Sequence, residues 1–150
     1  MKVALGSDHA GYAGKEAAKQ VLERLGIAYE DFGTRSATES VDYPDYAQAV
    51  GEAVAKGQAD CGLLFCGTGI GVGIAANKIP GIRAAVVHDV ETARLAREHN
   101  DANVMAMGVR NTDPKILPAV IETFLTTAFA GGRHARRIEK ITALETAARS

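Results

Sequence analysis

A cysteine followed by closely spaced glycines, at residues 66–73 (CGTGIGVG), is the strongest chemical signal in this sequence. Glycines at alternate positions let several backbone N–H groups converge on one anion, and a helix that starts there adds positive potential. The same field favours a thiolate at Cys66, which can act as a base or as a nucleophile. Glycine spacing is weak evidence by itself, because a tight turn beside an inert buried cysteine has the same pattern.

Several well-known phosphate-binding motifs do not fit this segment. Val72 stands where a dinucleotide-binding G-x-G-x-x-G needs its last glycine and where a Cys-x5-Arg phosphatase loop needs its arginine. Lys78 lacks the preceding glycine and the following Ser or Thr of a P-loop. A receiver domain would have Asp in place of Cys66. The remaining interpretation is a strand–loop–helix anion site.

Two polar pairs flank apolar runs elsewhere in the chain. Asp8 and His9 end the first run, whereas His99 and Asn100 come just before the last one. Both pairs also have structural interpretations, the first as a helix cap and the second as a helix end with Asn100 in the left-handed conformation. The position of Asp8 and His9 favours a ligand-binding role, and for His99 both interpretations stay open.

Basic residues in the last third of the chain could hold a phosphate. Arg110 follows the last apolar run, and Arg133 and Arg137 are spaced i, i+4, so they share one face of a helix. Two guanidinium groups on one face can grip a phosphate bidentately. Because Arg136 and Lys140 lie close by, an ordinary solvated surface is the alternative.

The remaining candidates are weaker. Tyr43 precedes Pro44 in a long polar loop and is either a pocket wall or a packing residue. Cys61 lies at the start of an apolar run and is interpreted as core. His88 and His134 have no metal-ligand spacing with another His or Cys, so we expect neither a metal ion nor another cofactor.

Short apolar runs alternate with helical stretches, which is typical of an α/β protein with a covered parallel sheet. We predict a single domain over residues 1–150, a Rossmann-like three-layer α/β/α sandwich with a five-stranded parallel sheet of order 2-1-3-4-5 and an additional C-terminal helix. Ligands then bind at the carboxyl ends of strands one and three, where residues 8–9 and 66–71 lie. The expected strands are 3–5, 27–32, 61–66, 83–87 and 104–107, and the expected helices are 15–25, 46–56, a short one ending near 78, 89–99, 113–127 and 133–149.

The composition excludes several classes of protein. The chain has 150 residues, 47% of them hydrophobic and 23% charged, with a net charge of -1, which argues against disorder and against general binding of nucleic acid or anionic membranes. Its apolar runs are shorter than the roughly 20 residues that span a bilayer. Two cysteines are too few for a disulfide framework, so we expect a reduced, cytoplasmic protein.

Six sequence blocks in this order resemble the type B ribose-5-phosphate isomerases, a family shared with the galactose-6-phosphate isomerase subunits. The resemblance covers nearly the whole chain and implies aldose–ketose isomerisation of a sugar phosphate through an enediolate. It also implies homodimers or tetramers whose sites combine two chains, with residues 99–110 reaching a neighbour's site. The blocks are residues 6–11 (GSDHAG), 42–44 (DYP), 66–71 (CGTGIG), 74–78 (IAANK), 99–103 (HNDAN) and 131–134 (GGRH).

The resemblance also implies roles for individual residues. Cys66 is the base that moves a proton between C2 and C1, because the Glu of a second branch of the family is replaced here by Val72. His99, assisted by Asp8, opens the sugar ring. The enediolate and sugar contacts are Thr68, the amides of Gly67, Gly69, Ile70 and Gly71, Asn100 and Tyr43, and the phosphate contacts are His9, Arg110, Arg133 and Arg137.

Three alternatives to a ribose-5-phosphate isomerase remain open. An isomerase for a hexose 6-phosphate, of the allose or galactose type, would use the same chemistry. A Cys–His hydrolase or thiol transferase would use Cys66 as nucleophile and His99 as base, but would not need several cations to anchor a phosphate. A non-catalytic sensor of sugar phosphates or nucleotides would not need Cys66, Thr68 and His99 together.

Overall fold

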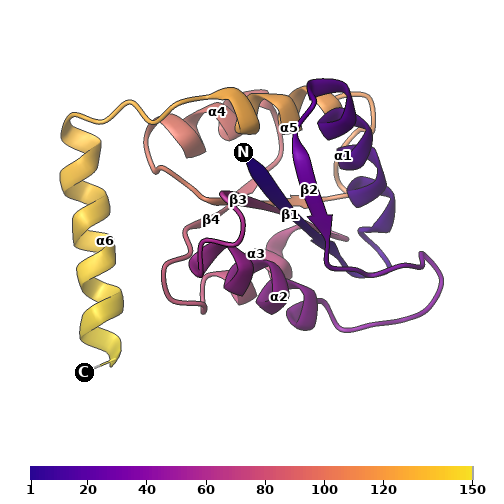
Figure 1. The fold of residues 1–150 in the computed structure, drawn as a ribbon, viewed down its shortest axis with the longest axis horizontal. Coiled ribbons are helices and arrows are strands. Elements are labelled where there is room, and N and C mark those ends of the chain that lie inside the picture. Colours follow the sequence, from indigo (N-terminus) through magenta and orange to yellow (C-terminus); the bar gives the residue numbers. More distant parts are fainter. Residues whose placement is uncertain (150) are drawn as a thin grey trace.

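Within residues 1–149, which this computed structural model describes, five parallel strands form one sheet between two layers of helices (Figure 1). Each predicted strand and helix is present, with shifts of a few residues at the ends. The strands are β1 (Lys2–Ser7), β2 (Ala28–Asp31), β3 (Cys61–Cys66), β4 (Ala84–Val87) and β5 (Val104–Gly108). The helices are α1 (Tyr12–Leu25), α2 (Tyr43–Ala55), α3 (Ile70–Ala76), α4 (Val90–Glu98), α5 (Leu117–Thr126) and α6 (Arg133–Arg149).

The sheet has a hydrophobic core on each of its faces. Helices α1, α4 and α5 cover one face, and α2 and α3 cover the other (Figure 1). Strands β1, β3 and β5 lie between the two cores, so their apolar side chains are buried whichever way they point. This explains why these strands read as continuous apolar runs rather than as alternating ones.

The predicted strand order is wrong in its last two positions. The sheet runs β2-β1-β3-β5-β4, so β5 pairs with β3 and β4 forms the edge. Every residue of β5 is buried, whereas Val86 in β4 keeps 45% of its surface exposed. A strand whose side chains are partly solvated is the less costly one to leave at an edge, and the fully apolar strand takes the interior position.

The ends of the helices follow local chemistry. Gly26 ends α1 in the left-handed conformation, and Asp89 caps α4 through a reciprocal capping box with Thr92, both as expected. Helix α1 begins earlier than predicted, at Tyr12, and the N–H of its N-cap residue Gly11 donates to Asp8 Oδ1 at 2.9 Å. After α4 the residue with a positive φ is Asp101, not Asn100 as the structural interpretation had it.

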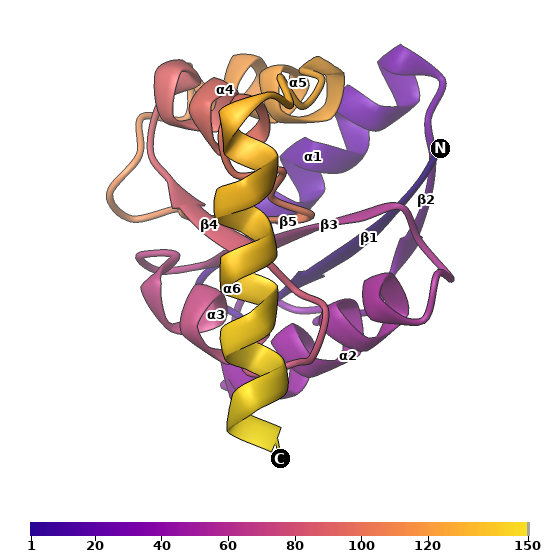
Figure 2. The same ribbon diagram turned by 90° about the vertical axis from the view of Figure 1, so that its left-hand side faces the viewer.

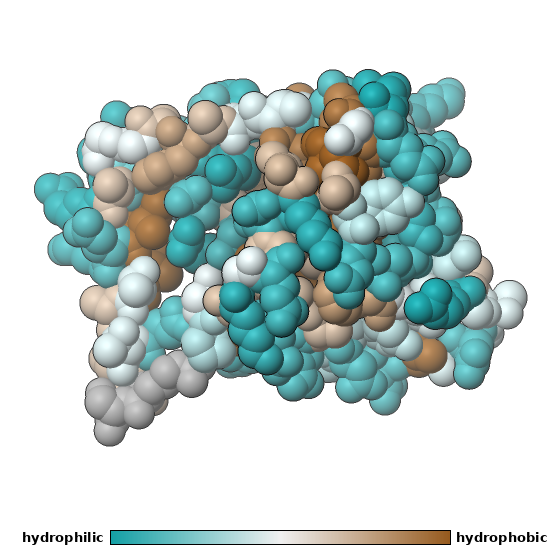
Figure 3. Space-filling model, viewed as in Figure 1, coloured by the Kyte–Doolittle hydropathy of each residue, from teal (hydrophilic) through white to brown (hydrophobic). Residues whose placement is uncertain are grey.

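Helix α6 stands off the rest of the molecule. It runs from the layer of α4 and α5 toward that of α2 and α3, across the edge that β4 forms (Figure 2). Apolar side chains gather on its side nearer the body (Figure 3), while Ile141 and Leu144 remain 45% and 72% exposed. Glu145 ties the helix to the body by accepting the N–H of Gly81.

A buried lysine organises the end of β2. Lys15 of α1 is fully buried, and its Nζ lies 2.7 Å from Asp31 Oδ2, which Lys19 Nζ also approaches at 2.6 Å. Burial opposes ionisation of Asp31, but hydrogen bonds from the two lysines and the Gly33 amide outweigh it and hold the pKa of Asp31 below its ordinary value.

We predict that Asp31→Asn lowers the free energy of unfolding by about 3 kcal/mol, because the buried Lys15 ammonium then keeps only its longer contact with the more exposed Glu16 carboxylate as counter-charge. Glu30→Gln in the same strand is the control, since its ion pair with Lys2 is about half exposed and is worth about 0.5 kcal/mol. Urea denaturation of both variants measures the difference. An equal decrease in the free energy of unfolding for both variants would show that the buried Lys15–Asp31 pair stabilises the fold no more than the exposed Lys2–Glu30 pair.

Candidate active site

The carboxyl ends of β1 and β3 lie side by side, as predicted. Ser7 pairs with Phe65 in the parallel register, and the N–H of Asp8 donates to the carbonyl oxygen of Phe65. Asp8 and His9 therefore lie beside the loop that begins at Cys66. Asp8 is 6% exposed, and its carboxylate is partly engaged by the Gly11 amide.

The loop after β3 places a backbone donor on the Cys66 thiol. Gly69 N–H donates to Cys66 Sγ at 3.1 Å, and the thiol is 5% exposed. Gly69 has φ +81°, and a Cβ there would lie 2.8 Å from the backbone of Met107, so glycine is required on both counts. Thr68 Oγ1 accepts the N–H of Ile70, which begins α3. An amide donor at this distance stabilises a sulfur that carries negative charge.

The second cysteine lies at the opposite end of the same strand and has a different environment. Burial raises the pKa of Cys61 to about 11, which keeps it a neutral thiol. The sequence predicts Cys61 in the core, but it is only partly buried and packs against the core cluster rather than inside it.

Arg110 and Tyr43 border the glycine loop. Arg110 N–H donates to the carbonyl of Gly67 at 2.9 Å, and its guanidinium would lie 3.3 Å from a Cβ at Gly67. The Tyr43 ring covers Gly71, where a Cβ would be 2.6 Å away. A cation and an aromatic wall thus lie against the glycine-rich loop. This combination suits a small phosphorylated ligand.

The other candidate residues gather at the amino end of the sheet. His99 ends α4, and its ring stacks on His134 with centroids 4.3 Å apart and an angle of 16° between the planes. Arg133 and Arg137 lie close enough to influence the charge of His134. His134 has no metal-ligand spacing with another His or Cys, and the sequence carries no signal that two distant histidines stack.

The candidate residues therefore form two clusters at opposite edges of the sheet. The carboxyl-edge cluster holds Asp8, His9, Tyr43, residues 66–71 and Arg110, and the amino-edge cluster holds His99, Asn100, Arg133, His134 and Arg137. Asn103, which follows the amino-edge cluster, accepts the N–H of Gly62 at the start of β3. Strand β3 from Cys61 to Cys66 spans roughly 16 Å, so one chain does not bring its own Cys66 and His99 together.

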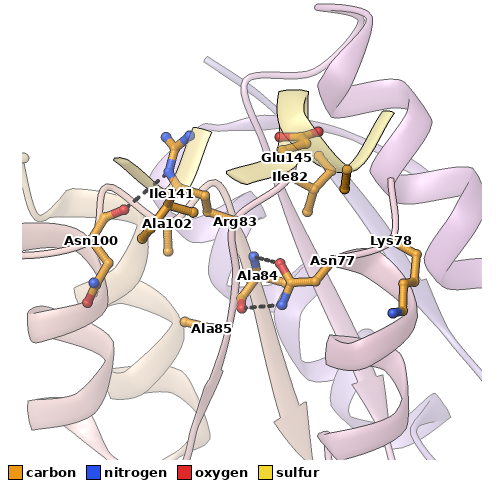
Figure 4. Close-up of a pocket in the computed structure, with 11 residues that line it drawn as sticks. Asn77, Lys78, Ile82, Arg83, Ala84, Ala85, Asn100, Ala102, Ile141 and Glu145 are labelled. Atoms are coloured by element: carbon orange, nitrogen blue, oxygen red, sulfur yellow. Dashed lines mark hydrogen bonds between the residues drawn. The ribbon is translucent and has the colours of Figure 1, made fainter. Parts of the chain in front are cut away.

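A cavity of about 720 Å³ opens between α6 and the edge strand β4 (Figure 4). Asn100 lines it together with Arg83, Ile141 and Glu145. The side chain of Asn77 forms its floor by bonding both the N–H and the carbonyl of Ala84, at 2.8 and 3.0 Å. The cavity therefore adjoins the amino-edge cluster, away from Cys66.

Two further features bear on the class of protein. Across residues 1–149, His, Cys, Asp and Glu side chains do not gather in groups of three that could hold a metal ion. In the same part of the chain, none of the helices is sufficiently long and apolar to cross a membrane.

Fold and site together define an α/β protein with a glycine-rich loop at the switch point of a parallel sheet. Residues 3–141 match the family model described as Ribose/Galactose Isomerase. The chain is 44% identical over 144 residues to ribose-5-phosphate isomerase B of Escherichia coli, with 96% of each chain covered. It is 48% identical over 145 residues to a putative sugar phosphate isomerase of Bacillus subtilis, with 97% of each covered.

Solved structures agree with these relatives. Ribose-5-phosphate isomerase B of Clostridium thermocellum superposes with a TM-score of 0.95 at 48% identity, over 97% of this chain and 98% of that one. The Mycoplasma genitalium protein of the same name, solved with bound ribulose-5-phosphate, superposes with a TM-score of 0.92 at 38% identity, over 97% and 96% of the two chains. The chain belongs to the ribose/galactose isomerase family.

The histidine stack predicts a pH dependence of stability. Burial, followed by the charges of His99, Arg133 and Arg137, lowers the pKa of His134 below its ordinary value of 6.5. Below that pH the unfolded chain binds a proton that the folded chain does not, so the stack costs stability as the pH falls through this range.

We expect the unfolding midpoint in urea to fall less between about pH 7.5 and about pH 5.5 for His134→Phe, which keeps an aromatic ring without its titration, than for the wild type. His88→Gln is the control, because the His88 side chain is 67% exposed and should leave the pH dependence unchanged. An identical pH dependence for His134→Phe and the wild type would contradict the assignment.

Proposed function

We propose that this protein, as a single domain over residues 1–150, interconverts ribose 5-phosphate and ribulose 5-phosphate through an enediolate, with Cys66 as the base. The observation that carries the proposal is the amide of Gly69 on Cys66 Sγ at the head of the glycine loop. The position where a second branch of the family has Glu is Val72, which is fully buried and cannot take a proton. The thiol is therefore the base that this loop offers.

The loop also supplies the electrostatic part of the reaction. Moving a proton from C2 to C1 puts negative charge on the carbonyl oxygen, and preorganised donors stabilise that charge by roughly 3–4 kcal/mol each. We assign this role to Thr68 and the amides at residues 67 and 69–71, of which those of Gly69 and Ile70 also contact Cys66 Sγ and Thr68 Oγ1. His9 and Arg110 border the same edge and are suited to hold the phosphate.

We propose further that a second copy of the chain completes each site. The resemblance assigns ring opening to His99 and phosphate binding to Arg133 and Arg137, yet these residues lie at the edge of the sheet opposite Cys66. A homodimer, or a tetramer built from such dimers, can bring the amino-edge cluster of one copy to the carboxyl-edge cluster of the other. The free thiols and a phosphorylated substrate fit a cytoplasmic enzyme.

Substrate comparison tests the proposed activity. We expect kcat/KM to be higher for ribose 5-phosphate than for allose 6-phosphate or galactose 6-phosphate. The family model covers galactose enzymes as well, so a preference for a hexose phosphate would keep the chemistry and replace the substrate.

We predict that Cys66→Ala abolishes isomerisation while substrate binding is nearly unchanged, because a general base acts in the chemical step. The matched control is Cys61→Ala, which removes the other thiol and should keep the activity. Iodoacetamide should inactivate the wild type and Cys61→Ala alike, and bound substrate should protect both. An active Cys66→Ala enzyme would rule out the thiol mechanism.

We predict that two inactive variants restore activity when their chains exchange. In a heterodimer of Cys66→Ala and His99→Asn, one of the two shared sites has both wild-type residues, so random exchange should recover about a quarter of the wild-type activity. Co-refolding the two purified variants and assaying ribose 5-phosphate measures this. Cys66→Ala mixed with Thr68→Ala is the control and should stay inactive, because both changes fall in the same cluster. No recovery in the first mixture would place each complete site within one chain.

A further inference from the structure

The loop between β2 and α2, residues 32–42, begins at the site. Ser7 N–H donates to the Gly33 carbonyl at 2.8 Å, and Thr34 N–H donates back to the Ser7 carbonyl at 2.7 Å. These bonds continue the pairing of β1 and β2 up to the residue before Asp8. The start of the loop is therefore fixed to the strand that carries Asp8 and His9.

This starting point is also held by the buried ion pair. Asp31 Oδ1 accepts the N–H of Gly33 at 2.8 Å, while Asp31 Oδ2 is held by Lys15 and Lys19. Further along, Ser36 Oγ accepts the N–H groups of Thr38 and Glu39, both at 3.1 Å, and closes a compact turn. Such bonds give an exposed loop a defined path.

The loop returns to the site at its far end. Val41 N–H donates to Nδ1 of His9 at 3.2 Å, and the next residues begin α2, where Tyr43 covers Gly71. A backbone N–H is always a donor, so the nitrogen that faces it is a lone pair. A neutral imidazole with its lone pair on Nδ1 carries its proton on Nε2.

We propose that the Val41 amide is a positioning group that fixes His9 as the Nε2–H tautomer and so aims a donor at the ligand. The identity of that ligand as a phosphate rests on the proposed function. Phosphate oxygens are acceptors, so the opposite tautomer would turn a lone pair toward them. Residues 34–41 of the loop, which lie outside the six family blocks, thereby act through their backbone rather than through their side chains.

Nuclear magnetic resonance of the wild type tests the tautomer directly. In protein labelled with ¹⁵N, we expect the His9 ring to show a proton on Nε2 and a bare Nδ1, with a through-hydrogen-bond coupling between the Val41 amide nitrogen and Nδ1. His9→Gln assigns the ring signals by removing them. A His9 that carries its proton on Nδ1, with no coupling to Val41, would overturn the proposal whether or not the chain isomerises ribose 5-phosphate.

A proline substitution tests the consequence for binding. Val41→Pro removes the N–H, whereas Val41→Ala keeps it and is the matched control. We expect Val41→Pro to show both His9 tautomers and to raise KM for ribose 5-phosphate about tenfold with a smaller change in kcat, the size expected when one hydrogen bond to a charged group is lost. Unchanged His99 and His134 signals would show that its fold is intact. A pure Nε2–H tautomer in a folded Val41→Pro protein would also overturn the proposal.

Discussion

The close approach of two loops at the end of β3 and β5 is the constraint on which the site depends. The pairing of these strands continues past their ends, because Val109 N–H donates to the Cys66 carbonyl and Arg110 N–H donates to that of Gly67. Backbone meets backbone there, so a Cβ at Gly69 would lie within 3 Å of Met107. The same contact turns the Gly69 amide toward the Cys66 sulfur and holds Arg110 over the loop. This contact forms only when β5 lies beside β3, so the geometry of the site depends on the strand order.

A parallel sheet separates groups that follow its strands from groups that precede them. Cys66 and Arg110 follow strands, whereas His99 precedes one, and the length of β5 lies between the two clusters. A rearrangement of loops within one chain cannot bridge the distance between the two clusters, but an association of two copies of the chain can. The features of α6 agree with such an arrangement, since the helix stands off the body beside a cavity and exposes Leu144 and Ile141.

Much of the fold could be predicted from the sequence because apolar runs, Gly26 and Asp89 act locally. The order of β4 and β5 could not, since both are short and apolar and their difference in burial depends on what packs around them. The glycine loop was visible because glycine is required where backbones touch. The stack of His99 on His134 and the Val41 amide on His9 were not visible, because each joins residues that only the fold brings together.

The two cysteines of β3 show what position contributes beyond residue type. Both belong to one six-residue strand, and the strand's direction alone distinguishes their surroundings. At its start, Cys61 is partly buried against the core, and burial raises its pKa. At its end, Cys66 meets a backbone that has left the sheet and turned its amides inward. In a parallel sheet every strand ends at the same edge, so backbone amides that no longer pair within the sheet surround one space at that edge. A thiol at the carboxyl end of a strand faces this space. A thiol at the amino end of the same strand cannot reach it.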